Sequence, residues 1–195
     1  MMYLKAILKN ILHWIALVVT LPFALLSGFG RVETMYVLWA QGCALIPGIP
    51  GDYLRTAYYR MTLEECAPES RIQFGSVFAH PQARVGHRVY IGSYCILGRT
   101  TIGDRTQIAS AVQVLSGAHQ HGRGKDGRVL GSEQGRFETV AIGSDCWIGG
   151  GAIVMAQVGE GSTIGAGAVV THPIPAHSVA VGNPARVIKP AQSEG

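Results

Sequence analysis

Residues 85–98 read VGHRVYIGSYCILG, and this stretch decides the fold. Aliphatic residues recur at every sixth position, at Val85, Ile91 and Leu97, and each is followed directly by glycine. A fixed short period predicts a repeat architecture and takes precedence over ordinary helix and strand assignments. The same pattern continues, with a few changes of step, at Ile102, Ile108, Val114, Ile142, Ile148, Val154, Val158, Ile164 and Val170.

The physical reading of this repeat is a solenoid. Each hexad predicts a short strand and a turn, with the aliphatic side chain pointing inward and the following glycine allowing the backbone to bend tightly. Three hexads make one triangular coil, and stacked coils line up their aliphatic residues as a continuous core. The alternative, β-hairpins in a sandwich, requires period-two alternation and turn pairs such as Asn-Gly, and the sequence has neither.

Three segments carry a resemblance to a known family. They are IGSDCWIG at 142–149, IGAGAVVT at 164–171 and AVGNPARVI at 180–188. Over roughly residues 70 to 190 the chain resembles the hexapeptide-repeat acyltransferases, and most of all the sugar O-acetyltransferases of bacterial polysaccharide pathways. The resemblance implies a mainly β fold, a left-handed parallel β-helix, a homotrimer, and acetyl-CoA as acyl donor.

The first fifty residues differ from the repeat region. Apolar runs cover 11–29 and 35–49, with a turn-like charged link at 27–33 between them. A cleaved signal peptide fits poorly because the apolar core is too long, and a β-helix has little surface on which to bury two such helices. The sequence therefore predicts a membrane-associated helical hairpin over 1–50.

The remaining chain divides into three parts. Residues 51–70 form an amphipathic connector, residues 71–190 the β-helix domain with a loop at 116–139, and residues 191–195 a tail. The connector is expected to contain a helix from Tyr53 to Glu65, which has two compatible roles. Arg55 and Arg60, with Tyr53, Tyr58 and Tyr59, would suit a lipid headgroup layer, or the helix would cover the unpaired strands at the end of the solenoid.

Loop 116–139 is where chemistry is expected, because a long loop leaving a regular scaffold is more often functional than filler. It begins with Ser116-Gly117-Ala118-His119, which resembles the segment that carries the catalytic histidine of the family. Imidazole titrates near neutral pH, so His119 could take the proton of an attacking sugar hydroxyl. His121 lies close but does not match by spacing, and an ordinary loop histidine is the alternative reading of His119.

The resemblance also implies residues for coenzyme A. Small residues along the C-terminal coils would let the pantetheine arm lie against the backbone, although turn geometry alone could explain each glycine. Arg186 and Lys189 would meet the phosphates. His172 stands where the family usually has lysine, and the four-residue step from Val154 to Val158 replaces a longer family insert. The residues implied for the pantetheine arm are Trp147, Gly149, Gly150, Gly165, Ala166 and Thr171.

Composition excludes several other functions. The formal charge is +4 and the pI about 9.0, but the positive charges are scattered, so nucleic acid is not an expected partner. Four cysteines without paired spacing predict reduced, buried thiols. A zinc site like that of a β-helical carbonic anhydrase would need three well-spaced histidines. His87, His119 and His121 imitate such a set poorly, so no metal is expected.

These observations predict an acetyl-CoA-dependent O-acetyltransferase acting on a sugar hydroxyl of a polysaccharide or lipid-linked glycan precursor, by direct transfer in a ternary complex. An N-acyltransferase of a nucleotide-linked amino sugar and a non-catalytic β-helical scaffold are the alternatives. Lys5 and Lys9 favour a cytoplasmic N-terminus by the positive-inside rule. The expected location is the bacterial inner membrane, in contact with membrane lipid, with the catalytic domain in the cytoplasm.

Overall fold

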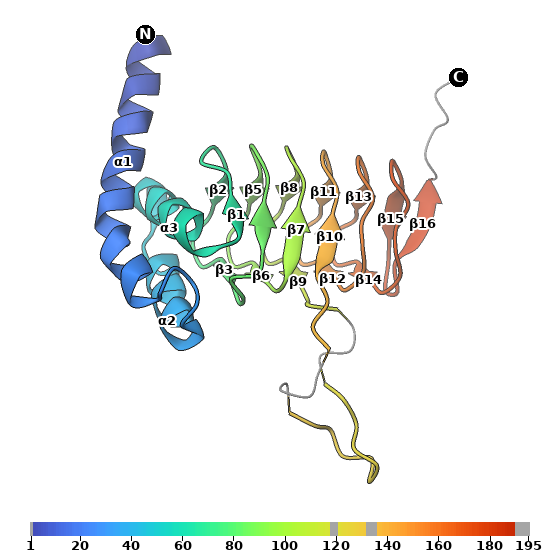
Figure 1. Ribbon diagram of the computed structural model, residues 1–195. Helices are drawn as coiled ribbons and strands as arrows, with labels where there is room; N and C mark the ends of the chain where they lie inside the picture. The colour runs from blue at the N-terminus through green and yellow to red at the C-terminus, as the bar shows by residue number, and fades with distance from the viewer. Residues whose placement is uncertain (1, 118–120, 132–135, 190–195) are drawn as a thin grey trace.

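The computed structural model describes residues 2–117, 121–131 and 136–189, without the side chains of residues 2–6. Three helices come first: α1 (Met2–Leu26), α2 (Glu33–Ala44) and α3 (Gly48–Thr62). A stack of short strands follows, running away from the helices (Figure 1). The helices lie at one end of the stack, and the last described strand lies at the other.

The strands are two to four residues long, as a hexad with a turn allows. They are β1 (Glu65–Cys66), β2 (Arg71–Ile72), β3 (Val77–Phe78), β4 (Arg84–Val85), β5 (Tyr90–Ile91), β6 (Ile96–Leu97), β7 (Thr100–Ile102), β8 (Gln107–Ile108), β9 (Gln113–Val114), β10 (Val140–Ile142), β11 (Trp147–Ile148), β12 (Ile153–Val154), β13 (Thr163–Ile164), β14 (Val169–Val170), β15 (Val179–Val181) and β16 (Arg186–Lys189).

These strands form three sheets, and each coil adds one strand to each sheet in turn. The sheets have the orders β1-β4-β7-β10, β2-β5-β8-β11-β13-β15-β16 and β3-β6-β9-β12-β14. All pairs are parallel except β15 with β16, which closes the stack. The predicted mainly β, parallel solenoid is confirmed, whereas its left-handed sense stays a prediction.

The aliphatic columns form the core, as the six-residue repeat predicted. Every aliphatic residue of the repeat, from Val85 to Val170, is buried. The strand register places equivalent residues of successive coils opposite each other, so that Ile91 pairs with Ile108 and Ile108 with Ile148. Burial at about 25 cal/mol per Å² of apolar surface makes these columns the main stabilising feature of the domain.

The glycines after the aliphatic residues play a different role from the one expected. Gly92 and Gly143 do not have positive φ; a Cβ built on them would lie 2.5 Å from the backbone nitrogens of Ser110 and Glu160 in the next coil. Glycine is therefore required there because the coils stack closely. The corner residues that do adopt positive φ come two positions later, as at Tyr94 and Gly151.

The short step from Val154 to Val158 does not disturb the stack. Val158 bridges in parallel to Ile142 on one side and to Ile174 on the other, which extends the first sheet. The next strands keep their partners, with Val170 of β14 opposite Val154 of β12. Four residues are therefore enough to turn this corner.

Helices α2 and α3 cap the first coil. Phe78 of β3 donates its N–H to the Tyr59 hydroxyl (3.1 Å) and accepts from the Tyr36 hydroxyl through its C=O (3.0 Å). On β2, the carbonyl of Ile72 accepts from Nε of Arg55 (2.8 Å). Side chains of the cap thus satisfy backbone groups of an open edge, which otherwise invites pairing with another strand.

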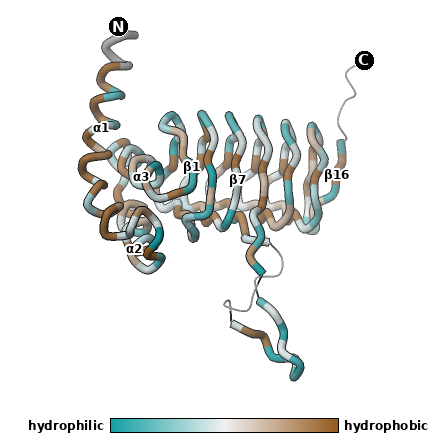
Figure 2. Tube along the Cα trace, in the orientation of Figure 1, coloured by the Kyte–Doolittle hydropathy of each residue, from teal (hydrophilic) through white to brown (hydrophobic). Residues whose placement is uncertain are grey.

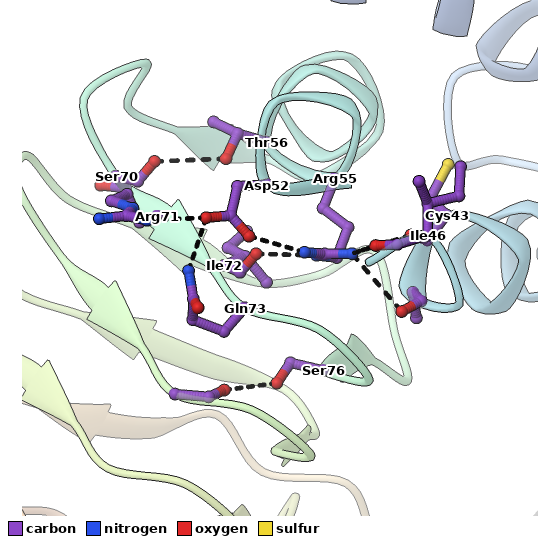
Figure 3. A network of polar contacts seen from close by, with 12 residues as sticks. Cys43, Ile46, Asp52, Arg55, Thr56, Ser70, Arg71, Ile72, Gln73 and Ser76 are labelled. Atoms are coloured by element: carbon purple, nitrogen blue, oxygen red, sulfur yellow. Dashed lines mark hydrogen bonds and ion pairs between the residues drawn. The ribbon is translucent and has the colours of Figure 1, made fainter. Parts of the chain in front are cut away.

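Arg55 lies at the centre of this cap (Figure 3). It is fully buried, and it also donates to the carbonyls of Cys43 (3.1 Å) and Ile46 (2.7 Å) and to Oδ1 of Asp52 (2.8 Å). The expectation that Arg55, Tyr58 and Tyr59 lie in a lipid headgroup layer is therefore wrong. All three are buried because the open edge needs donors and apolar cover, and the capping role is confirmed.

The N-terminal hairpin also differs from its prediction. The second arm contains only the twelve residues of α2, about 18 Å of helix, too short to cross a hydrocarbon core of about 30 Å. It buries Tyr36, Ala40 and Cys43 in the cap instead. Within the described residues, α1 is the helix that could cross a membrane by length and composition, over Ile7–Leu26.

Candidate functional site

The long loop leaves and rejoins the solenoid between Ser116 and Glu138, two residues held together by a backbone hydrogen bond and here called the loop root. The Ser116 side chain is buried, and its hydroxyl accepts from the backbone N–H of Arg99 (2.8 Å). The chain returns beside it, where Glu138 N–H donates to the Ser116 carbonyl (2.9 Å) and Val140 N–H to the Arg99 carbonyl (2.9 Å). The two ends of the loop are thus held together. The loop projects away from the three-sided stack of coils, here called the prism (Figure 1).

His119, the predicted general base, lies outside the described residues. Its neighbour His121 lies within them, and its Nδ1 is 3.2 Å from the Leu130 carbonyl. Farther out, Arg123 and Val129 form an antiparallel bridge, so the tip of the loop is a small hairpin. His121 therefore belongs to the projecting part of the loop, while His119 stays a prediction two residues after the root at Gly117.

Arg99 and Phe137 at this root were missed from the sequence. The Arg99 guanidinium lies over the Phe137 ring, 5.2 Å from its centroid, and the His80 ring meets the same phenyl edge-on at 5.3 Å. Nε of Arg99 is buried and, among the described residues, has no hydrogen-bond partner. A buried N–H of this kind points to an acceptor from a bound molecule or from an undescribed residue.

The small residues predicted for coenzyme A lie along one edge of the prism. Gly149 and Gly150 turn the chain from β11 to β12, and Gly165 and Ala166 turn it from β13 to β14. A Cβ on Gly149 would overlap the Ala166 backbone nitrogen, so close stacking already explains this glycine. Gly150 has more room, since a Cβ there would meet only the Ser110 carbonyl at 3.4 Å and the Ala109 side chain.

Thr171 and His172 lie on a different edge, the one from which the loop leaves. Thr171 Oγ1 is 2.9 Å from His172 Nδ1, and both side chains are accessible. They follow β14, two coils beyond the loop root, or about 10 Å along the stack at the usual strand spacing. Within a single chain, His172 therefore lies on the same edge of the prism as the loop, whereas Gly149, Gly150, Gly165 and Ala166 lie on another edge.

The larger side chains that the sequence predicted to contact coenzyme A lie on the seven-stranded sheet, which contains β11 and β16. Trp147 of β11 is exposed, and Arg186 and Lys189 lie on the exposed strand β16. One Arg186 Nη donates to the neighbouring Ala185 carbonyl (3.1 Å), which leaves most of its guanidinium for other partners. These side chains are accessible for a ligand but do not enclose one.

Two cavities lie elsewhere, beside α1. A cavity of about 310 Å³ is lined by residues of α1, α3 and the first coil, including Lys9, His13, Asp52, Glu69 and Arg71. The predicted coenzyme A residues lie on an open surface instead. An enclosed donor site there would need a second surface against this one.

The cysteines and histidines offer little for other chemistry. All four cysteines are buried and free, and burial raises the pKa of the Cys146 thiol, whose S–H points at the Gly159 carbonyl (3.1 Å). His87 pairs with Glu69 at 3.0 Å. Over the parts of the chain with assigned positions, no three His, Cys, Asp or Glu side chains gather as metal ligands would.

Comparisons with known proteins agree with this architecture. Residues 139–172 match the family model described as the hexapeptide repeat of succinyl-transferase. Nodulation protein L of Rhizobium leguminosarum bv. viciae is 45% identical over 109 residues, 53% of this chain and 55% of that protein. A Staphylococcus aureus (strain MRSA252) protein named as an acetyltransferase is 51% identical over 57 residues, 28% of this chain. The alignments span 55% of the Rhizobium protein and 29% of the Staphylococcus protein, so this chain covers about half or less of these curated relatives.

Two solved structures extend the likeness to most of the chain. A maltose O-acetyltransferase from Clostridium difficile 630 is 26% identical with a TM-score of 0.66, over 82% of this chain and 89% of that one. A galactoside acetyltransferase in complex with coenzyme A shares the fold at 22% identity, a TM-score of 0.67 and 82% coverage of both chains. The predicted resemblance to the hexapeptide-repeat acyltransferases is confirmed.

Proposed function

We propose that this chain is a membrane-associated O-acetyltransferase that moves an acetyl group from acetyl-CoA to a sugar hydroxyl of a polysaccharide or lipid-linked glycan precursor. The observation that carries the proposal is the β-solenoid interrupted once, between β9 and β10, by a loop that opens with the Ser116–His119 segment. The 26% identical maltose O-acetyltransferase over most of the chain supports a sugar acceptor.

The reaction is a direct transfer. The acceptor oxygen attacks the thioester carbonyl carbon while His119 takes the hydroxyl proton. The tetrahedral oxyanion then collapses with loss of the coenzyme A thiolate, which receives that proton from His119. Positioning of donor and acceptor supplies much of the rate, and backbone N–H groups along a coil edge suit the oxyanion.

We further propose a left-handed homotrimer. Within one chain, the loop and His172 lie on one edge of the prism, and Gly149, Gly150, Gly165 and Ala166 lie on another. A neighbouring copy could bring its glycine edge against the loop edge of the first and cover the open donor surface. Trp147 and Thr171 would then line the pantetheine arm, and Arg186, Lys189 and His172 would face the phosphates.

The decisive experiment replaces His119 by Asn. Acetyl transfer should fall by about 10²- to 10⁴-fold, while coenzyme A binding and the oligomeric state stay unchanged. The matched control is His121→Asn, which should keep most of the activity because His121 belongs to the projecting hairpin. Full activity of His119→Asn together with loss in His121→Asn would reverse the assignment.

The acceptor is tested with lipid-linked sugars against nucleotide-linked amino sugars. Release of the coenzyme A thiol with the lipid-linked sugars would support the proposal. Release only with the amino sugars would replace it by N-acylation. No release with either, together with no acetyl-CoA hydrolysis, would leave a non-catalytic scaffold.

A further inference from the structure

The surface of α1 that faces away from the solenoid is apolar over its whole described length. Its most exposed side chains include Ile7, Trp14, Val18 and Leu25, and these recur at helical spacing on one face. Within Ile7–Leu26, only 17% of the most apolar 18-residue window is buried, so α1 is not a core helix. Figure 2 shows the apolar colouring along α1 and α2 at this end of the molecule.

The opposite side of α1 is committed to protein. Ala16, Thr20, Ala24 and Ser27 are buried, and their small size lets α1 lie close to α3, its main contact. Thr20 and Ser27 satisfy their own hydroxyls, bonding to the carbonyls of Ala16 (2.7 Å) and Ala24 (2.9 Å). Lipid can therefore reach only one side of this helix.

Charged groups lie beside the middle of α1. Arg60 of α3 is bonded through Nη1 to Nε2 of His13 (2.7 Å), and Lys9 lies one turn earlier on α1. His13 is only about 5 Å along the helix from the centre of the Ile7–Leu26 segment. A spanning α1 would bring Arg60 and the first coil into the hydrocarbon, where an arginine side chain costs several kcal/mol.

We propose that α1 lies in the plane of an anionic bilayer surface and does not cross it. Its outer face enters the acyl boundary, about 5–10 Å deep, as in amphipathic interfacial helices. Lys9 and Arg60, on the protein side of α1, then sit at the level of the phosphates. Figure 1 shows α1 running across the end of the stack, so the coils rise away from the membrane.

Charge around the cavity at α1 favours an anionic surface. The two carboxylates nearest to it are already engaged, since Asp52 binds Arg55 and Arg71 and Glu69 binds His87. Lys9 makes no ion pair with the described residues, and the partner of Arg60 is an imidazole. Exposed apolar side chains also follow α1 in the chain, at Phe29, Val32, Leu38, Leu45 and Ile49.

The inference rests on the membrane association in the proposed function and fixes its geometry. Depth measurements on the full chain test it. The four native cysteines are buried, and burial raises their thiol pKa values, so nitroxide labels attach selectively to new surface cysteines. Ile7→Cys, Val18→Cys and Leu25→Cys place labels on one face, and Ile188→Cys at the far end of the stack is the control.

Relaxation by oxygen and by a water-soluble nickel complex, on vesicles of phosphatidylcholine with about one third phosphatidylglycerol, gives each label's depth. An in-plane helix gives three similar shallow depths and a water-exposed Ile188→Cys. A spanning helix places residues 7 and 25 near opposite faces of the bilayer and makes residue 18 the deepest, by up to about 16 Å relative to residue 7 and about 10 Å relative to residue 25; this result would overturn the proposal. Water-exposed labels at all positions would overturn it too, and so would labels shielded from both reagents because another copy covers the face.

Binding to the same vesicles supplies the second measurement. Val18→Asp should weaken binding about tenfold or more, because it places a carboxylate in the acyl boundary, whereas Ile188→Asp should not. Arg60→Gln should weaken binding about fivefold only when phosphatidylglycerol is present, with Lys125→Gln in the loop as its control. Equal binding by all four variants would refute the assigned face. None of these measurements uses acetyl transfer. A protein that shows three similar shallow depths but no acetyl transfer would therefore refute the proposed enzymatic function and leave the membrane geometry standing.

Discussion

Replacing Arg55 by Met should separate the cap from the solenoid. Methionine keeps an unbranched apolar stem but lacks the guanidinium group and therefore every donor. The carbonyls of Ile72, Cys43 and Ile46 then lose bonds of 2.8, 3.1 and 2.7 Å. Asp52 keeps Arg71 and Gln73, so its charge is not left alone.

The magnitude follows from these contacts. Each buried carbonyl left without a donor costs about 1–3 kcal/mol, and breaking a buried ion pair costs about 3–5 kcal/mol in all. We therefore expect Arg55→Met to lower the free energy of unfolding by about 4 kcal/mol. For a chain of this length that corresponds to a fall in Tm of about 10 °C.

The assay is urea unfolding followed by circular dichroism, with hydrogen exchange to locate the change. Stacked repeats can unfold in stages, so the first transition is the relevant one. Faster exchange should appear in α2, α3 and the first coil, and not in β11 to β14. Arg71→Met is the matched control, because it removes the exposed partner of the same Asp52 and should cost less than 1 kcal/mol. Equal losses in the two variants would show that the buried bonds of Arg55 do not hold the cap.

Three further outcomes are expected. Gly149→Ala should destabilise the coils by at least 1–3 kcal/mol through overlap with the next coil, whereas Gly131→Ala, which meets nothing within 4 Å, should stay within 0.5 kcal/mol; equal thermal stability would contradict the stacking role. Burial raises the pKa of Cys66 to about 12 and of Cys43 to about 11. The stability that comes from burying these protonated thiols is fully present below about pH 8.5, the unfolded pKa, and is lost as pH rises toward the folded values. Alkaline titration should therefore unfold the chain between about pH 8.5 and 12, and fast thiol reactivity of the native chain at pH 8 would argue against burial. If His172 contacts a coenzyme A phosphate, His172→Ala should weaken coenzyme A binding and His172→Lys should retain it; calorimetry that finds the same affinity for wild type and both variants would leave His172 without a phosphate.

The repeat shows how much of the fold could be predicted. A column such as Ile91, Ile108 and Ile148 is visible in the sequence because burial imposes the period directly. The role of Gly92 was misassigned because its constraint comes from Ser110 in the next coil, which no single hexad reveals. The position of the loop also followed from the sequence, since the aliphatic period stops at Val114.

The N-terminal region was harder to predict for a related reason. Hydropathy counts apolar residues but does not show what they face, so the segment around Tyr36 resembled a membrane arm although it covers β3. Arg55 was placed at a lipid surface because amphipathic patterning cannot reveal that the carbonyls of Ile72 in β2, Cys43 in α2 and Ile46 after α2 all need a donor at one point. The division of candidate residues between two edges became evident only with the sheet order.

The loop root has a consequence for how such a protein can diversify. Residues 100–102 pair directly with residues 140–142, so the solenoid closes in register whatever the length of the segment between Ser116 and Glu138. Loop length is therefore uncoupled from the core, and the usual cost of lengthening a closed loop grows only with the logarithm of its length. Recombination or insertion at this corner could exchange one acceptor preference for another while every coil below and above keeps its partners.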